Sequence, residues 1–146
     1  MFDNLKVATV DQFVKATLGT GVPGNYVAVV SSFDEELRLR DLLWEEIQKI
    51  AENGDYVIEE INPYVDTSDL SSKMEAKLPE GKTGIALYKE LRPDNHYLSP
   101  LTTGCVPKNW MVLGVLRCDE TSKESEKETK EIWLKLKQPF ALKVTL

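Results

Sequence analysis

The sequence predicts an α+β fold. Residues 1–146 would form a single two-layer domain, in which one long helix packs on a face of a mixed, mostly antiparallel sheet. Three observations support this fold: a strand–helix–strand pattern over residues 26–61, a buried strand over residues 110–118, and alternating apolar residues near the C-terminus. A chain of 146 residues has the length of one ordinary domain and can bury a core that needs no disulfides.

The central helix is predicted over residues 34–53. Ser32 and Glu35 have the spacing of a capping box, in which each side chain accepts a hydrogen bond from a backbone N–H at the helix start. Gly54 can adopt the left-handed conformation that commonly ends a helix. Between these ends, the apolar residues that recur at helical spacing are Leu39, Leu43, Ile47, Ile50 and Ala51.

The elements around this helix follow from similar patterns. Residues 26–30 form an apolar, β-branched run typical of a strand buried on both faces, and residues 56–61 form the return strand. Gly19–Gly24 matches the letters of a dinucleotide-binding GxGxxG motif. That motif needs a strand before it and a helix after it, whereas here a short helix over residues 7–18 precedes it, so we interpret it as a turn. A short helix over residues 67–78 and a strand over residues 83–91 are also predicted.

The C-terminal third predicts further strands. Residues 110–118 are apolar on both faces and belong at the centre of a sheet. Residues 119–130 contain no aliphatic or aromatic side chain, which indicates a solvated loop or a frayed helix, as in a hairpin connection. Residues 131–137 and 140–146 alternate apolar and polar side chains. Because Pro139 lies between them, two strand pieces at a sheet edge are expected.

A nucleophilic site is conceivable in residues 92–109, a long stretch without sustained periodicity. Connections of this length are uncommon and often functional. The stretch contains Asp94, Cys105 and His96, the only histidine of the chain. In such a site His96 would take the thiol proton of Cys105, and Asp94 would orient His96. No spacing rule supports this set, and no helix follows Cys105 to lower its thiol pKa. The simpler interpretation is an ordered loop with a buried cysteine and a surface histidine.

The same stretch favours a small-molecule site between the loop and the central helix. The candidate lining residues are Tyr88, Arg92, Tyr97 and Trp110, which place aromatic surface and one cation near the loop.

Composition and charge disfavour several other classes of protein. The net charge of −6 would repel a nucleic-acid backbone. One histidine and two cysteines offer no ligand pair at metal-binding spacing, so neither a metal site nor a cofactor is predicted. The longest apolar run, residues 110–116, is too short to cross a membrane. With no signal-peptide pattern at the start, a cytoplasmic location is expected.

Three functional classes remain, in a ranked order. No catalytic set stands out, which favours a non-enzymatic protein-interaction module, such as an adaptor, inhibitor or assembly subunit, that binds a protein partner or self-associates. Its candidate contact residues are Trp133, Lys135 and Arg40, although lysines beside Trp133 are also typical of a protected edge strand. The alternatives are a small-molecule-binding module with its site near residues 92–109, and a hydrolase or transferase that uses Cys105 and His96.

Overall fold

Six strands form one sheet in the order β1-β6-β2-β5-β4-β3, and every neighbouring pair of strands is parallel. The computed structural model describes residues 4–62, 70–91, 107–119, 121–136 and 140–146. The strands are β1 (Val7–Thr9), β2 (Gly24–Val30), β3 (Tyr56–Ile61), β4 (Thr83–Tyr88), β5 (Trp110–Arg117) and β6 (Phe140–Thr145).

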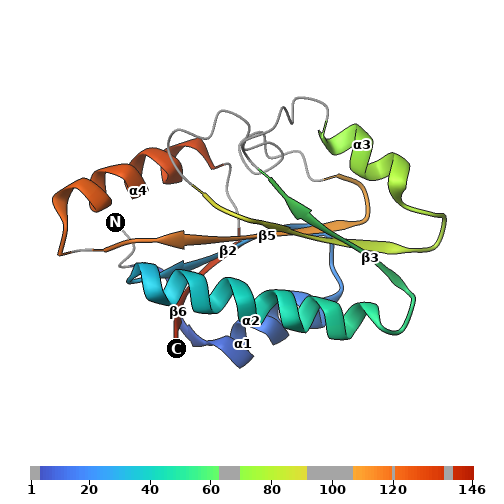
Figure 1. Ribbon diagram of the computed structural model, residues 1–146, viewed down its shortest axis with the longest axis horizontal. Coiled ribbons are helices and arrows are strands. Elements are labelled where there is room, and N and C mark those ends of the chain that lie inside the picture. Colours follow the sequence, from blue (N-terminus) through green and yellow to red (C-terminus); the bar gives the residue numbers. More distant parts are fainter. Residues whose placement is uncertain (1–3, 63–69, 92–106, 120, 137–139) are drawn as a thin grey trace.

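Helices cover both faces of the sheet, which makes the fold α/β (Figure 1). Helices α1 and α2 lie on one face, and α3 and α4 lie on the other (Figure 1). The helices are α1 (Val10–Ala16), the short 3-10 helix η1 (Leu18–Thr20), α2 (Phe33–Ala51), α3 (Leu70–Lys77) and α4 (Lys123–Lys135). Within the described residues, no helix is both long enough and apolar enough to cross a membrane.

The predicted α+β fold with a mostly antiparallel sheet was wrong, because all six strands are parallel. The strands β2 and β5 were correctly predicted as buried on both faces, which is the pattern of a parallel sheet covered by helices on each side. The error came from residues 119–137, interpreted as a polar connection followed by a strand. With a helix there instead, the chain makes a parallel crossover from β5 to β6.

Helix α4 agrees with the frayed-helix alternative for residues 119–130 and replaces the predicted strand over residues 131–137. Its first turn is capped by Ser122, whose Oγ accepts a hydrogen bond from the backbone N–H of Ser125 at 3.3 Å. Thr129 and Ile132 are buried at helical spacing, whereas Leu134 is 69% exposed. Ile132, Leu134 and Leu136 therefore alternate in the sequence without sharing one face of the structure. Strand β6 lies between β1 and β2, so its predicted place at a sheet edge was also wrong.

Helix α2 confirms the prediction for the centre of the chain. Ser32 Oγ accepts a hydrogen bond from the backbone N–H of Glu35 at 3.2 Å. Glu35 Oε2 accepts from the N–H of Ser31, whereas a capping box predicts the N–H of Ser32 as the donor. Gly54 has a φ of 76°, as expected after the helix end. The side chains of Leu39, Leu43 and Ile47 are fully buried against the sheet.

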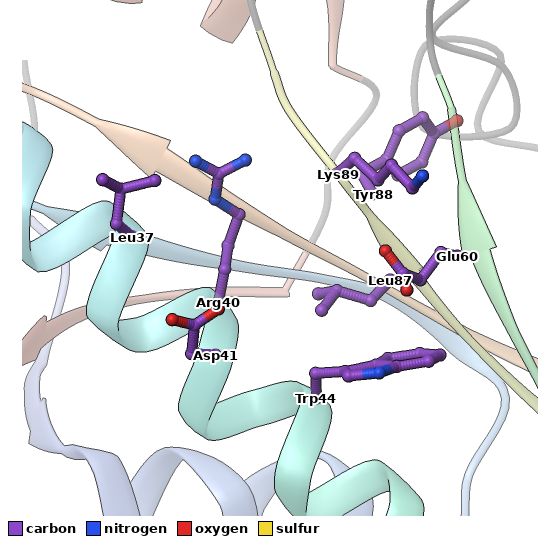
Figure 2. A pocket seen from close by; sticks show the side chains of 8 residues that line it. All are labelled: Leu37, Arg40, Asp41, Trp44, Glu60, Leu87, Tyr88 and Lys89. Carbon is purple, nitrogen blue, oxygen red and sulfur yellow. The ribbon is translucent and has the colours of Figure 1, made fainter.

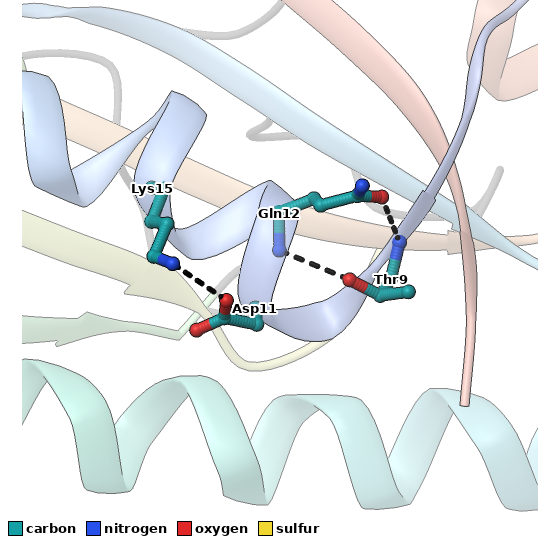
Figure 3. A network of polar contacts seen from close by, with 4 residues as sticks. All are labelled: Thr9, Asp11, Gln12 and Lys15. Carbon is teal, nitrogen blue, oxygen red and sulfur yellow. Dashed lines mark hydrogen bonds and ion pairs between the residues drawn. The ribbon is translucent and has the colours of Figure 1, made fainter.

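Helix α1 is shorter than predicted, because residues 7–18 contain a strand, a helix and the start of η1. Thr9 and Gln12 form a capping box at its start: Gln12 N–H donates to Thr9 Oγ1 at 3.1 Å, and Thr9 N–H donates to Gln12 Oε1 at 2.9 Å (Figure 3). The ion pair of Lys15 with Asp11, at 2.9 Å, lies on the same helix (Figure 3). The glycine-containing turn after η1 leads into β2, so it does not have the strand–turn–helix geometry of a dinucleotide motif.

The hydrophobic core has two layers, one on each face of the sheet. Phe13 of α1 and Leu43 of α2 belong to the first layer, and Met74 of α3 and Ile132 of α4 belong to the second. Because β2 and β5 occupy the middle of the sheet, their side chains contribute to both layers. The helices are thus anchored along the sheet, and functional groups are expected at its edges and at the strand ends.

Candidate functional site

The carboxyl ends of the strands are the first place to search for a site in this fold. In open parallel sheets, ligands bind where neighbouring strands are followed by helices on opposite faces. Here β2 and β5 are neighbours, and they lead into α2 on one face and α4 on the other. The switch point of the sheet is therefore between the ends of β2 and β5.

The described residues leave no room for a ligand at the switch point itself. Glu36, Arg117 and Thr129 contribute to the walls of its crevice, which encloses only about 20 Å³, roughly the space of one water. The turn from β2 into α2 consists of Ser31 and Ser32, without the glycines and the lysine of a phosphate-binding loop. The Glu35 carboxylate already accepts the Ser31 N–H, so it occupies the place where a phosphate would be bound.

A larger groove lies beside the switch point, between α2 and the ends of β3 and β4 (Figure 2). It encloses about 400 Å³, which is within the range of sites for small ligands. We call it the α2 groove. Its lining residues are Leu37, Arg40, Asp41 and Trp44 from α2, Glu60 from β3, Leu87 and Tyr88 from β4, and Lys89 directly after β4.

The periods of helix and strand explain why these residues meet. The α2 residues of the groove recur at intervals of three and four, so they form one stripe beside the buried stripe of the same helix. Glu60 is paired with Leu87 across the two strands, and Leu87 packs in the core layer under α2. The Lys89 N–H donates to Ile61 O at 2.9 Å, which continues the β3–β4 ladder one residue past β4. Strand alternation then directs Glu60 and Lys89 to the α2 face.

The groove contains two cations and two carboxylates. Arg40 Nη2 lies 3.4 Å from Glu36 Oε2, and both side chains are largely buried. Arg40 Nε is buried and finds no acceptor among the described residues. Lys89, Asp41 and Glu60 are exposed, and the described part of the chain shows no ion pair or hydrogen bond for their side chains. Three charges that are unpaired among the residues described, together with Arg40, which is paired with Glu36, therefore surround a partly apolar floor.

The floor of the groove is formed by Trp44 and Leu87. Figure 2 shows the indole of Trp44 reaching from α2 toward Leu87 and Glu60, with the Arg40 guanidinium at the opposite end of the groove. Trp44 is half-buried and packs against the core layer under α2. One surface of the indole is thus held by the protein, and the rest is available for an apolar or aromatic group.

The predicted ligand-binding residues are only partly brought together. Tyr88 lines the α2 groove, but its ring points away from α2 into the opposite core layer (Figure 2). Trp110 is fully buried at the amino end of β5, and its Nε1 donates to Met74 O at 3.0 Å. Arg92 and Tyr97 lie outside the described residues, as do the predicted catalytic residues Cys105, His96 and Asp94.

The predicted protein-contact residues are separated in the structure. Arg40 lies in the α2 groove, whereas Trp133 and Lys135 are on α4, on the other face of the sheet. Trp133 is half-buried against the α4 core layer and so contributes to packing. The described residues contain no cluster of three side chains suited to hold a metal ion.

Sequence reasoning missed Trp44, Glu60 and Lys89 as site residues. The signal for Trp44 is its place beside the apolar stripe of α2, a position that is equally typical of a residue that only widens the core face of a helix. Glu60 and Lys89 are ordinary charged residues near strand ends, and their proximity depends on β3 and β4 being neighbours.

Comparison with known proteins suggests no function. The chain matches no model of a known protein family, and no curated protein matches it. The functional conclusion therefore depends on the residues of the α2 groove.

Proposed function

We propose that the chain is a non-catalytic binding module that holds a small molecule in the α2 groove. The observation that carries the proposal is the set of four charged side chains around Trp44, of which only Arg40 has an ion pair among the described residues, at the carboxyl end of a parallel sheet. Charged side chains are normally solvated or paired with each other, and four of them around an apolar floor suit the recognition of a polar ligand. Lys89 of the groove lies three positions before residues 92–109 in the chain, the stretch for which the sequence had already suggested a site.

A binding role fits the groove better than catalysis does. A nucleophilic mechanism needs a nucleophile within hydrogen-bond reach of a base. Among the described residues, the groove contains no serine, cysteine or histidine, so it lacks a hydroxyl or thiol nucleophile paired with an imidazole base. The short turn before α2 and its own capping carboxylate also disfavour phosphate chemistry at the switch point.

Fluorine NMR of the three tryptophans tests this proposal. Protein that contains 5-fluorotryptophan should give one signal each for Trp44, Trp110 and Trp133, assigned by single Trp→Phe substitutions. A fragment library of neutral, acidic, basic and zwitterionic compounds is then added. We expect at least one compound to shift the Trp44 signal saturably and to leave Trp110 unchanged, because Trp110 is fully buried in the other core layer.

Matched charge variants provide the control. Lys89→Gln and Asp41→Asn change exposed groove residues, so they should leave folding nearly unchanged and weaken the bound fragment. Lys127→Gln and Glu45→Gln remove exposed charges on α4 and on another part of α2, and they should bind normally. If no fragment shifts Trp44, or if the control variants weaken binding as much as the groove variants, the proposed function is wrong.

Self-association is a second candidate, based on a shallow apolar depression between α1 and α2. It encloses about 340 Å³, and its apolar lining consists of Val10, Val14 and Leu42. Leu42 is 38% exposed although its helix has its own buried stripe. Light scattering during size-exclusion chromatography should show a dimer that Leu42→Asp dissociates and Leu134→Asp on α4 does not. A monomer at all concentrations would exclude this candidate.

A further inference from the structure

We infer that the α2 groove selects a zwitterionic small molecule with a flat apolar group, of which an aromatic α-amino acid is the simplest example. This inference rests on the proposed function, since it names the chemical class of the ligand in the same groove. It depends on the balance of charge, the positions of the charged groups and the indole on the floor.

The balance of charge disfavours a ligand of one sign. Arg40 and Lys89 would attract an anion, but Asp41 and Glu60 would repel it from the same groove. The reverse holds for a cation. A ligand that carries one charge of each sign can pair with both the cations and the carboxylates of the groove. The carboxylates then disfavour simple anions and the cations disfavour simple cations, which gives the groove its specificity.

The anionic group of the ligand would bind at Arg40. Its Nη2 is paired with Glu36 and its Nε is buried, which leaves Nη1 as the guanidinium nitrogen that can meet the ligand. A guanidinium presents its donors in a flat fork that matches a carboxylate. Lys89, on the opposite wall of the groove, adds a second positive charge.

The cationic group of the ligand would bind at Glu60. This side chain extends from β3 toward α2, and its carboxylate lies between Trp44 and the end of β4 (Figure 2). Asp41 adds negative charge at the exposed rim on α2. An ammonium donates hydrogen bonds in three directions, so it can bind a single carboxylate such as that of Glu60 without the planar pairing that a guanidinium makes.

The apolar group of the ligand would lie on Trp44. Figure 2 shows the indole close to Leu87, which supplies aliphatic surface beside it, whereas Leu37 lies near Arg40. An aromatic ring can stack on an indole, and such pairs contribute beyond the burial of apolar area. A volume of about 400 Å³ accommodates a compound with one ring and excludes an extended polymer.

Four analogues of phenylalanine test the inference directly. Phenylalanine carries both charges, N-acetylphenylalanine only the carboxylate, phenylalaninamide only the ammonium, and N-acetylphenylalaninamide neither. Their dissociation constants are measured from the Trp44 fluorine signal and checked by calorimetry. We expect phenylalanine to bind about tenfold more tightly than either singly charged analogue, since each charge-assisted hydrogen bond contributes about one such step.

Two charge-neutralising variants assign the two ends. Glu60→Gln should remove the preference for phenylalanine over N-acetylphenylalanine, and its preference over phenylalaninamide should persist. Lys89→Gln should weaken but not abolish the preference over phenylalaninamide, because Arg40 remains to bind the carboxylate, and it should leave the preference over N-acetylphenylalanine intact. Both residues are exposed, so both variants are expected to fold, and their unchanged urea midpoints provide the check.

The outcomes separate this inference from the proposed function. The inference is overturned if a singly charged analogue binds as tightly as phenylalanine, or if none of the four shifts Trp44. If another fragment still shifts Trp44 saturably, the groove remains a binding site and only the ligand class is wrong. If no compound of either set shifts Trp44, both proposals fail.

Discussion

Replacing Gly84 with alanine tests the packing of β4 against β5 in the core layer next to α3. Gly84 is paired with Trp110 across the two strands, and a Cβ on Gly84 would lie 2.1 Å from Cδ2 of the indole. Carbon atoms in contact are about 3.5–4.0 Å apart, so the ring would have to retreat by more than about 1 Å. Trp110 is fully buried and donates to Met74 O, and this shift would break that hydrogen bond.

The size of the destabilisation follows from the steric clash and the lost hydrogen bond. Overpacking a core costs about 1–3 kcal/mol, and a buried polar group that loses its partner costs about 1–3 kcal/mol. We therefore expect Gly84→Ala to lower the free energy of unfolding by about 3–5 kcal/mol, a large part of the stability of an ordinary domain. For a chain of this size the melting temperature should fall by about 10 °C or more.

Urea denaturation followed by circular dichroism measures the effect of Gly84→Ala. Gly24→Ala is a matched control in β2, because its Cβ would approach only the end of the Tyr26 ring, at 3.3 Å. It should change stability by less than about 1 kcal/mol. Trp110→Leu should cost less in the Gly84→Ala background than in the wild type, because the clash is then relieved. A Gly84→Ala protein as stable as the Gly24→Ala control would refute the packing described here.

Three further predictions concern stability. Leu43→Ala, in the fully buried stripe of α2, should lower the free energy of unfolding by about 2–5 kcal/mol in the same urea assay. Arg40→Ala should cost about 1–3 kcal/mol, since it removes an ion-pair partner from the buried Glu36, and Arg40→Lys should recover part of the loss. The hydroxyl and the N–H of Thr121 donate to Asp119 and hold the pKa of that carboxyl below its usual value. The stabilisation by Asp119 should thus be complete above its unfolded pKa of about 3.9 and disappear as the pH falls through the lower folded value. Stability curves of wild type and Asp119→Asn should converge at acidic pH, and a constant gap would contradict this assignment.

Local structure was largely predictable because its signals are local. The caps and the apolar stripe define α2, and the uninterrupted apolar runs define β2 and β5. These features depend on residues within one or two turns or along one strand. Their burial and their element types were confirmed, with end positions that differ by a few residues.

The direction of the strands could not be predicted from the sequence pattern, because the sequence of α4 fits both a strand and a helix. Ile132, Leu134 and Leu136 alternate like a strand, while Thr129 and Ile132 are the side chains that α4 buries. The polar first half of α4 has no apolar residue to reveal a helix. One misassigned helix changed a parallel crossover into a hairpin, and so changed the class of the fold.

The α2 groove depends on strand order, which the sequence does not encode locally. Glu60 and Lys89 are separated by 29 positions in the chain and meet only because β3 and β4 are neighbours. Arg40, predicted as a protein-contact residue, is largely buried in the structure and lines the groove, and its role as a protein contact stays a prediction.

The most direct test of the central claim is the fluorine signal of Trp44 during titration with phenylalanine. A saturable shift of Trp44, a constant Trp110 signal and about tenfold weaker binding of N-acetylphenylalanine are predicted. A Trp44 signal that stays constant while phenylalanine is added, or one that responds equally to all four analogues, would contradict a zwitterion-selective groove between α2 and the ends of β3 and β4.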